Sequence, residues 1–69
     1  MAQGNSDFGY YGASALSHEQ VHLNGGGEYP AFQRQESVFQ GFERFFQNPA
    51  LYRGLDESIR DGIKANQPQ

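Results

Sequence analysis

The sequence of 69 residues contains neither cysteine nor tryptophan, and it has few basic residues. Without cysteine the chain forms no disulfide and no thiolate metal site. This absence fits a reducing intracellular compartment or a virus particle better than a secreted protein. The five Lys and Arg residues stand singly along the chain against eight Asp and Glu, for a net charge of −3. Because nucleic-acid binding normally needs a basic stripe, we expect no nucleic-acid partner.

Long apolar runs are also lacking, and none approaches the ~20 residues that a membrane-spanning helix needs. The mean hydropathy is −0.78 and hydrophobic residues make up 36% of the chain, which is little for an autonomous core. Small chains usually need a disulfide, a metal or a partner to become stable. The six Phe and four Tyr residues are nevertheless many for a disordered linker, and aromatic residues are typical interface anchors. We therefore expect a chain that becomes ordered on larger partners and is not an independent globular fold.

Residues 1–30 form a glycine-rich segment that we interpret as an extended arm, because Gly and Asn favour turns over regular structure. A short helix is possible over residues 14–24, where Ser17 and Gln20 match a capping box. Three consecutive glycines then end that segment. Two interpretations stay open, an arm that makes contacts through its aromatic residues and a plain disordered tail.

A Phe-rich amphipathic helix is predicted over residues 31–47. Phe32, Phe39 and Phe46 recur every seven residues, and other apolar residues fall beside them at helical spacing. The charged residues lie outside this apolar arc, whereas Gln35 intrudes on it. Pro30 suits the first position of such a helix.

A second amphipathic helix is predicted over residues 49–65, followed by a tail at 66–69. The residue before a proline avoids the helical conformation, so Asn48 ends the first helix and can cap a new one that begins at Pro49. The predicted fold class is therefore mainly α with extended coil. An N-terminal arm without regular structure would precede two short amphipathic helices in a hairpin or bent pair.

Two helices cannot cover so aromatic a stripe on both sides, so part of it should remain available to a partner. We expect the stripe to dock in an apolar groove of larger protein subunits. The predicted partner-binding residues are Phe32, Val38, Phe39, Phe42, Phe45, Phe46, Leu51, Tyr52, Leu55, Ile59 and Ile63.

Residues 18–28 contain the pattern H-E-x-x-H, formed by His18, Glu19 and His22, with Gly25 and Glu28 at the later positions of the longer metzincin pattern. This segment resembles the zinc-metalloprotease signature, in which two His bind zinc and the Glu activates a bound water. That family packs the helix below a substrate-binding sheet, which the residues before His18 do not supply, and Glu28 replaces the usual third His. We therefore expect a short polar helix whose two His are solvated or contact a partner, and no metal.

The leading hypothesis is a small, non-catalytic structural or accessory subunit of a large assembly, such as a minor virion protein or a peripheral subunit of a large complex. No catalytic residue, cofactor or small-molecule substrate is expected. One alternative is a small regulatory binder or inhibitor of a larger enzyme, which would use the same Phe-rich face. Another is a zinc-binding protein that uses the His18–His22 pair.

Overall fold

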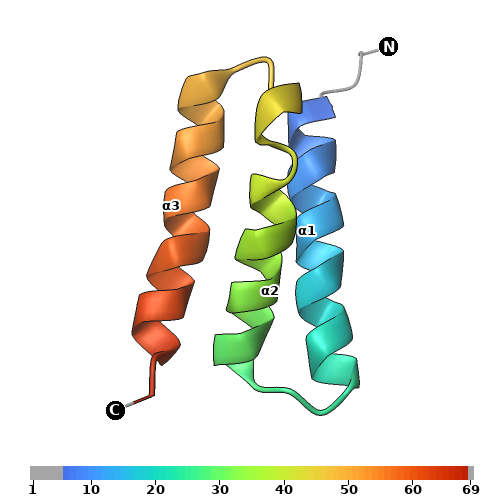
Figure 1. The fold of residues 1–69 in the computed structure, drawn as a ribbon, viewed down its shortest axis with the longest axis vertical. Helices are drawn as coiled ribbons and strands as arrows, with labels where there is room; N and C mark the ends of the chain where they lie inside the picture. The colour runs from blue at the N-terminus through green and yellow to red at the C-terminus, as the bar shows by residue number, and fades with distance from the viewer. Residues whose placement is uncertain (1–5, 69) are drawn as a thin grey trace.

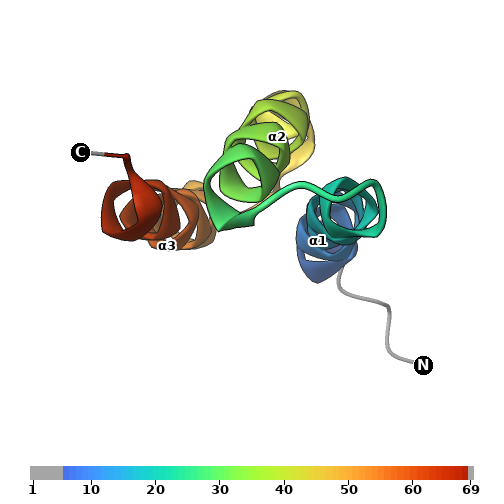
Figure 2. The same ribbon diagram turned by 90° about the horizontal axis from the view of Figure 1, so that it is seen from below.

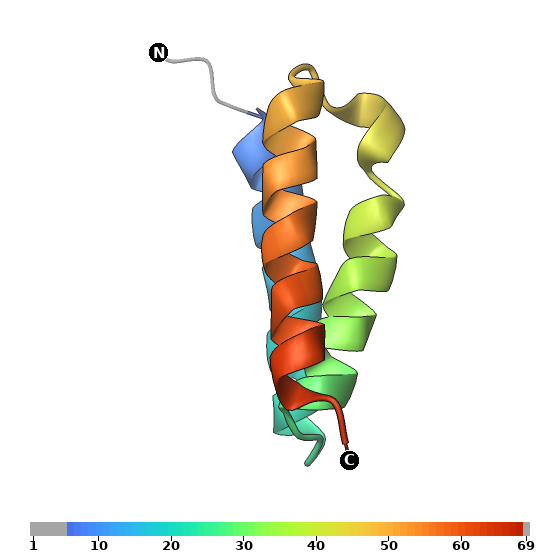
Figure 3. The same cartoon turned by 90° about the vertical axis from the view of Figure 1, so that its left-hand side faces the viewer.

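Three α-helices and one short 3-10 helix account for most of residues 6–68, the part of the chain that the computed structural model describes. Helix α1 spans Ser6–Leu23, α2 spans Glu28–Gln40, the 3-10 helix η1 spans Glu43–Phe45, and α3 spans Pro49–Asn66. Helix α2 lies between α1 and α3 and packs on both, and the outer two helices pack little on each other (Figures 1 to 3). The described residues thus form a compact all-α globule, and the expectation of a chain without an independent fold is wrong.

The predicted unstructured arm is also wrong over residues 6–13, because these residues belong to α1, whereas the short helix considered possible over residues 14–24 corresponds to the second half of α1; residues 1–5 lie outside the described part of the chain. The contact that anchors the start of α1 is far away in the sequence. The Asp7 carboxylate is 4% exposed and accepts hydrogen bonds from the backbone N–H groups of Gln47, at 2.9 Å, and Asn48, at 3.1 Å. Tertiary contact thus outweighs the weak local helix propensity of this glycine-containing segment.

Aromatic contacts hold α1 against α2 and η1. The Tyr10 ring stacks on Phe42 with 4.9 Å between centroids, and Tyr11 meets Phe39 edge to face at 5.9 Å. Ser14 is fully buried, and its hydroxyl donates to the Tyr11 carbonyl at 2.6 Å. The inner face of α1 therefore combines aromatic rings with a small residue that lets the helices approach closely.

Helix α2 is shorter than the predicted helix over residues 31–47 and begins earlier, at Glu28. Pro30 lies in its first turn, where a backbone N–H has no acceptor within the helix and its absence costs nothing. The helix ends at Gln40, and η1 and a short connection replace its predicted last turns. The Asn48 side chain accepts hydrogen bonds from the N–H groups of Ala50 and Leu51, both at 3.1 Å, so it caps α3 as predicted.

The core is mainly aromatic and lies between α2 and α3. Phe39 is 0% exposed and stacks on Tyr52 with 4.9 Å between centroids, while Ile59 is 1% exposed. Phe46 packs edge to face on Phe39 at 5.3 Å and on Tyr52 at 5.0 Å. We call the group of stacked and edge-to-face rings the aromatic end of the molecule. It comprises Tyr10, Tyr11, Phe39, Phe42, Phe46 and Tyr52.

An ion-pair group also links α2 to α3. Arg60 Nε lies 3.0 Å from Glu36 Oε2 and 3.1 Å from Asp56 Oδ2. Burial raises the pKa of the Glu36 carboxyl, and its hydrogen bond with Asp56 raises it further. Arg60 therefore offsets the repulsion of two carboxylates that are held close together. Among residues 6–68, no helix combines the length and apolar character that crossing a bilayer requires.

Candidate functional site

The chain uses most of the predicted partner-binding stripe for its own packing. Six of its residues form the core or pack directly against it: Phe32, Phe39, Phe46, Tyr52, Leu55 and Ile59. Four others are half-buried: Val38, Phe42, Leu51 and Ile63. Phe45 alone among the predicted residues is largely exposed, at 54%. The main exposed apolar surface therefore lies elsewhere in the described structure.

That surface is the side of α1 that faces away from α2. Phe8 is 53% exposed, Leu16 is 66% exposed and Leu23 is 84% exposed. Carboxylates occur on this helix only at Asp7, which is buried, and at Glu19, and the helix contains no Lys or Arg. A surface helix normally presents a charged face to water, whereas a helix that is apolar all round is normally buried. The exposed side of α1 is thus poor in charged residues for a surface helix.

Two glycines on the same side of α1 have no role in the packing of the chain. A Cβ atom added at Gly9 or at Gly12 would meet nothing within 4 Å. Glycine inside a helix costs about 1 kcal/mol relative to Ala, and no contact within the described structure requires it at either position. We call this side the outer face of α1. It comprises Phe8, Gly9, Gly12, Ala13, Leu16, Glu19, Gln20 and Leu23.

A second candidate site lies at one end of the molecule, where α1 turns into α2. The two histidines of α1 are four residues apart and therefore face the same way. The helix then ends in a Schellman motif, in which Gly25 N–H bonds to the His22 carbonyl at 2.9 Å and Gly26 N–H to the Val21 carbonyl at 2.8 Å. Gly25 has a φ of +90°, which favours glycine. This tight turn brings Glu28, the first residue of α2, back to the histidines.

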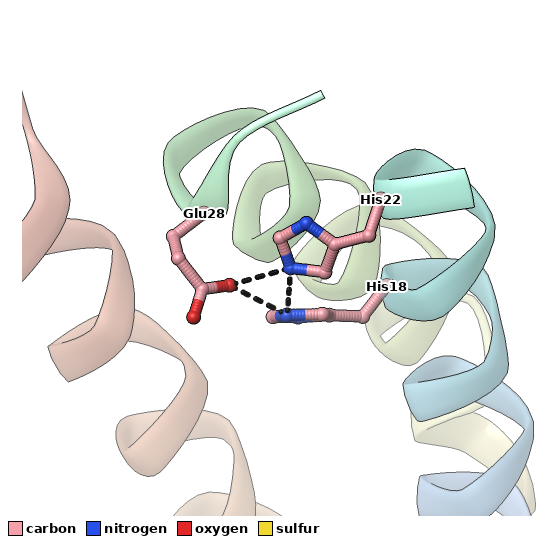
Figure 4. Close-up of side chains that lie close together, drawn as sticks. All are labelled: His18, His22 and Glu28. Carbon is pink, nitrogen blue, oxygen red and sulfur yellow. Dashed lines mark hydrogen bonds and ion pairs between the residues drawn. The ribbon is translucent and has the colours of Figure 1, made fainter. Parts of the chain in front are cut away.

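The three side chains meet through single atoms, as Figure 4 shows. Glu28 Oε1 lies 2.9 Å from His18 Nε2 and 2.7 Å from His22 Nε2. The two Nε2 atoms are 3.2 Å apart. The side chain of His18 is 13% exposed, that of His22 is 35% exposed and that of Glu28 is 52% exposed. We call these three residues the histidine cluster.

Both imidazoles are oriented by a contact at their other ring nitrogen. His22 Nδ1 lies 2.9 Å from the Gly26 carbonyl oxygen, and His18 Nδ1 lies 2.9 Å from Gln35 Oε1. Gln35 is only 3% exposed, and the Phe32 ring packs edge to face on His18 with 4.5 Å between centroids. Since both partner atoms are acceptors, each Nδ1 donates a proton and each Nε2 is left facing Glu28.

The same contacts shift the acidity of the cluster. The hydrogen bond to the Gly26 carbonyl raises the pKa of His22, and the bond to Glu28 raises it further. Hydrogen bonds from His22 and His18 lower the pKa of the Glu28 carboxyl. The site thus favours positive charge on the His22 imidazole and negative charge on Glu28.

The sequence indicated the spacing of this cluster but not its closure. His18 and His22 were expected to be solvated or to contact a partner, whereas they contact Glu28 within the chain. Gln35 was noticed only as a polar interruption of an apolar arc, and that interruption was the available signal of its role. Glu19, which a protease would need beside the metal, is exposed and outside the cluster. The described residues also contain no strand that could bind a substrate as in that family.

Comparison with protein-family models, with curated proteins and with solved structures gives no match to this chain.

Proposed function

We propose that this chain is a small, non-catalytic accessory subunit that docks on a larger protein of an assembly through the outer face of α1. A minor structural protein of a virus particle and a peripheral subunit of a large complex both fit this description. The supporting observation is a fully formed surface helix whose exposed face carries Phe8, Leu16 and Leu23 and a single charge, at Glu19. Exposed apolar surface of this kind marks interaction sites in folded proteins.

The surface is shaped for an α-helix of the partner. Gly9, Gly12 and Ala13 form a low strip between larger apolar side chains, and no atom of residues 6–68, apart from the adjoining turn of α1, lies within 4 Å of a Cβ added at either glycine. Small residues of this kind let a second helix backbone approach closely, as ridges of one helix enter grooves of another. An 18-residue helix is about 27 Å long and offers several turns of contact.

A different protein is favoured over a second copy of this chain by charge. Each copy carries a net charge of −3, so two copies repel, whereas a neutral or basic partner does not. Phe45 adds a second exposed aromatic residue near the start of α1, since its ring centroid lies 6.0 Å from that of Tyr10. It is the part of the predicted docking stripe that remains most accessible.

The test is to purify the tagged chain under cross-linking conditions from the cells or particles that contain it, with Leu16→Glu and Ser58→Glu as matched variants. Both positions are exposed on a helix, on α1 and α3 respectively. We expect Leu16→Glu to lose a stoichiometric partner at least tenfold and Ser58→Glu to retain it. Equal retention by both variants would contradict the proposal, and so would a wild-type chain that forms only homodimers.

The copy number of the chain in the purified complex separates an accessory subunit from a regulatory binder that uses the same face. A subunit is present at a fixed ratio in every preparation. A regulator or inhibitor is present at a ratio that follows its own concentration, because its binding is reversible.

A further inference from the structure

We infer that His18, His22 and Glu28 bind a divalent transition-metal ion, with zinc as the best match, and that this ion clamps the end of α1 to the start of α2. The inference does not depend on the proposed docking function, because His18 and His22 lie on the side of α1 that contacts α2 and are not part of the outer face. It departs from the expectation, drawn from the sequence, that the chain needs no metal.

Three electron-pair donors converge at one point when both imidazole rings are neutral. Because Gly26 and Gln35 accept from the two Nδ1 atoms, both Nε2 atoms carry a lone pair when the rings are neutral. These atoms lie 3.2 Å apart, and both face the same oxygen of Glu28. Such an arrangement is repulsive unless a cation is present among the three atoms, either a proton or a metal ion.

The three atoms also fit a metal coordination shell. Zinc binds His nitrogen and carboxylate oxygen at about 2.0–2.2 Å in a tetrahedron, which separates neighbouring ligand atoms by roughly 3.4 Å. The separations found, 2.7, 2.9 and 3.2 Å, need only a small outward movement. The side chain of Glu28 is half-exposed and can make this movement. A water molecule can take the fourth position from the solvent side.

The kinds of donor atom also determine which metal ions the site can bind. Two imidazole nitrogens and one carboxylate oxygen match zinc and its transition-metal neighbours, whereas magnesium and calcium prefer shells made of oxygen. The contacts of Nδ1 with Gln35 and with the Gly26 carbonyl are those that usually orient metal-binding histidines. The buried position of Gln35, 3% exposed, fixes one of these contacts firmly.

The role that follows is structural. The turn between α1 and α2 contains three consecutive glycines, the most flexible residues available, and the chain has no cysteine that could form a disulfide across it. A metal ion bound on both sides of this turn would restrict it. Glu19, which in the sequence motif would activate a metal-bound water, is not part of the cluster.

The experiment uses the untagged, chelator-treated full chain, so that no affinity tag binds metal. Cobalt(II) is titrated and followed by its visible absorption, zinc is then added in competition, and native mass spectrometry counts the ions bound. We expect one ion per chain and a tetrahedral cobalt spectrum. Glu28→Gln and His22→Gln should each weaken binding at least tenfold, whereas Glu19→Gln, the matched carboxylate next to His18, should bind like the wild type.

A further variant tests the orienting contact. Gln35→Met keeps the size of the side chain but removes the acceptor, and we expect it to weaken binding about 10- to 100-fold. Wild-type affinity in Glu28→Gln, with the fold verified by circular dichroism, would overturn the inference, as would a wild type that binds no more tightly than a variant with both histidines replaced. Leu16→Glu should bind zinc normally, so failure of the docking proposal and failure of this one are distinguishable.

Discussion

The two ends of the molecule are held together by different kinds of interaction. At the aromatic end, at the top of Figure 1, Phe39, Phe46 and Tyr52 exclude water through ring contacts of 4.9 to 5.3 Å between centroids. At the histidine end, at the bottom of Figure 1, polar atoms meet at 2.7 to 3.2 Å, and Glu28 remains half-exposed. The first kind of contact depends on area buried and little on direction. The second depends on direction and on protonation.

The contacts that hold α1 on α2 therefore differ in part from those that hold α3 on α2. Burial of Phe39 and Ile59 joins α2 to α3 under all conditions in which the chain folds. The attachment of α1 combines the ring contacts of Tyr10 and Tyr11 with polar contacts at Asp7 near one end and at the histidine cluster near the other. The helix that we propose to dock on a partner thus has, at the histidine cluster, contacts that depend on pH.

The largest expected effect lies at the aromatic end. Replacing Phe39 by Ala removes a fully buried ring, and such changes cost about 3–5 kcal/mol. A core of this size rarely supplies more than that, so we expect the variant to be unfolded. Urea denaturation followed by circular dichroism measures this effect. Phe45→Ala, at a residue 54% exposed, is the control and should change the free energy of unfolding by less than about 1 kcal/mol. A cooperative Phe39→Ala transition close to that of the wild type would refute the assignment of the core.

A smaller effect is expected where α1 meets the connection before α3. Asp7→Ala removes the acceptor of two part-buried hydrogen bonds, from the N–H groups of Gln47 and Asn48, and we expect the free energy of unfolding to fall by about 1–3 kcal/mol. We expect faster hydrogen exchange in the first turns of α1, while α2 and α3 keep their protection. Asp61→Asn, at an exposed carboxylate, is the control and should leave exchange unchanged. Uniform loss of protection in all three helices would mean that α1 does not open separately.

The sequence predicted the part of the fold that rests on regular apolar spacing. The stripe of α3 and its start at Asn48 and Pro49 could be recognised because the pattern and the cap lie within one segment. The first half of helix α1 could not be recognised in the same way, because its inner residues Tyr10, Tyr11 and Ser14 form no apolar stripe and glycines stand at positions 9 and 12. Its anchor at Asp7 is 40 residues away from its partner Gln47. Contacts between distant residues leave no periodic signal in a single sequence.

The candidate sites, too, could be predicted only in part from the sequence. The spacing of His18 and His22 was visible, but whether Glu28 returned to them depended on a turn of three glycines whose path the sequence leaves open. The partner-binding stripe was correctly seen as apolar, but burial between α2 and α3 could not be told apart from burial against a partner. The packing of a third helix, α1, on α2 changes which apolar residues remain exposed.

The smallest expected effect is a pH dependence that sharpens the contrast between the two ends, measured as the difference in melting temperature between the wild type and His22→Gln. In the presence of a chelator, the pKa of His22 is raised above its ordinary value of 6.5. The pair of His22 with Glu28 therefore stabilises the fold fully below about pH 6.5, and this contribution is lost as pH rises through the raised pKa. The lowered pKa of Glu28 means that its contribution is present above its ordinary value of 4.5 and is lost as pH falls through the lowered pKa. The difference in melting temperature between the wild type and His22→Gln should therefore be greatest between about pH 4.5 and pH 6.5 and decline toward alkaline pH.

With zinc added, the trend above pH 6.5 should reverse, because metal binding requires imidazoles without a proton on Nε2 and becomes stronger as they deprotonate. The difference in melting temperature between wild type and His22→Gln should then increase from pH 6 to pH 8, and Glu19→Gln should follow the wild type throughout. Phe45→Ala, beside the aromatic end, provides the internal reference, since it should shift the melting temperature equally with and without zinc. Parallel pH profiles in chelator and in zinc would show that the histidine cluster holds only a proton, and the two ends would then differ in polarity alone.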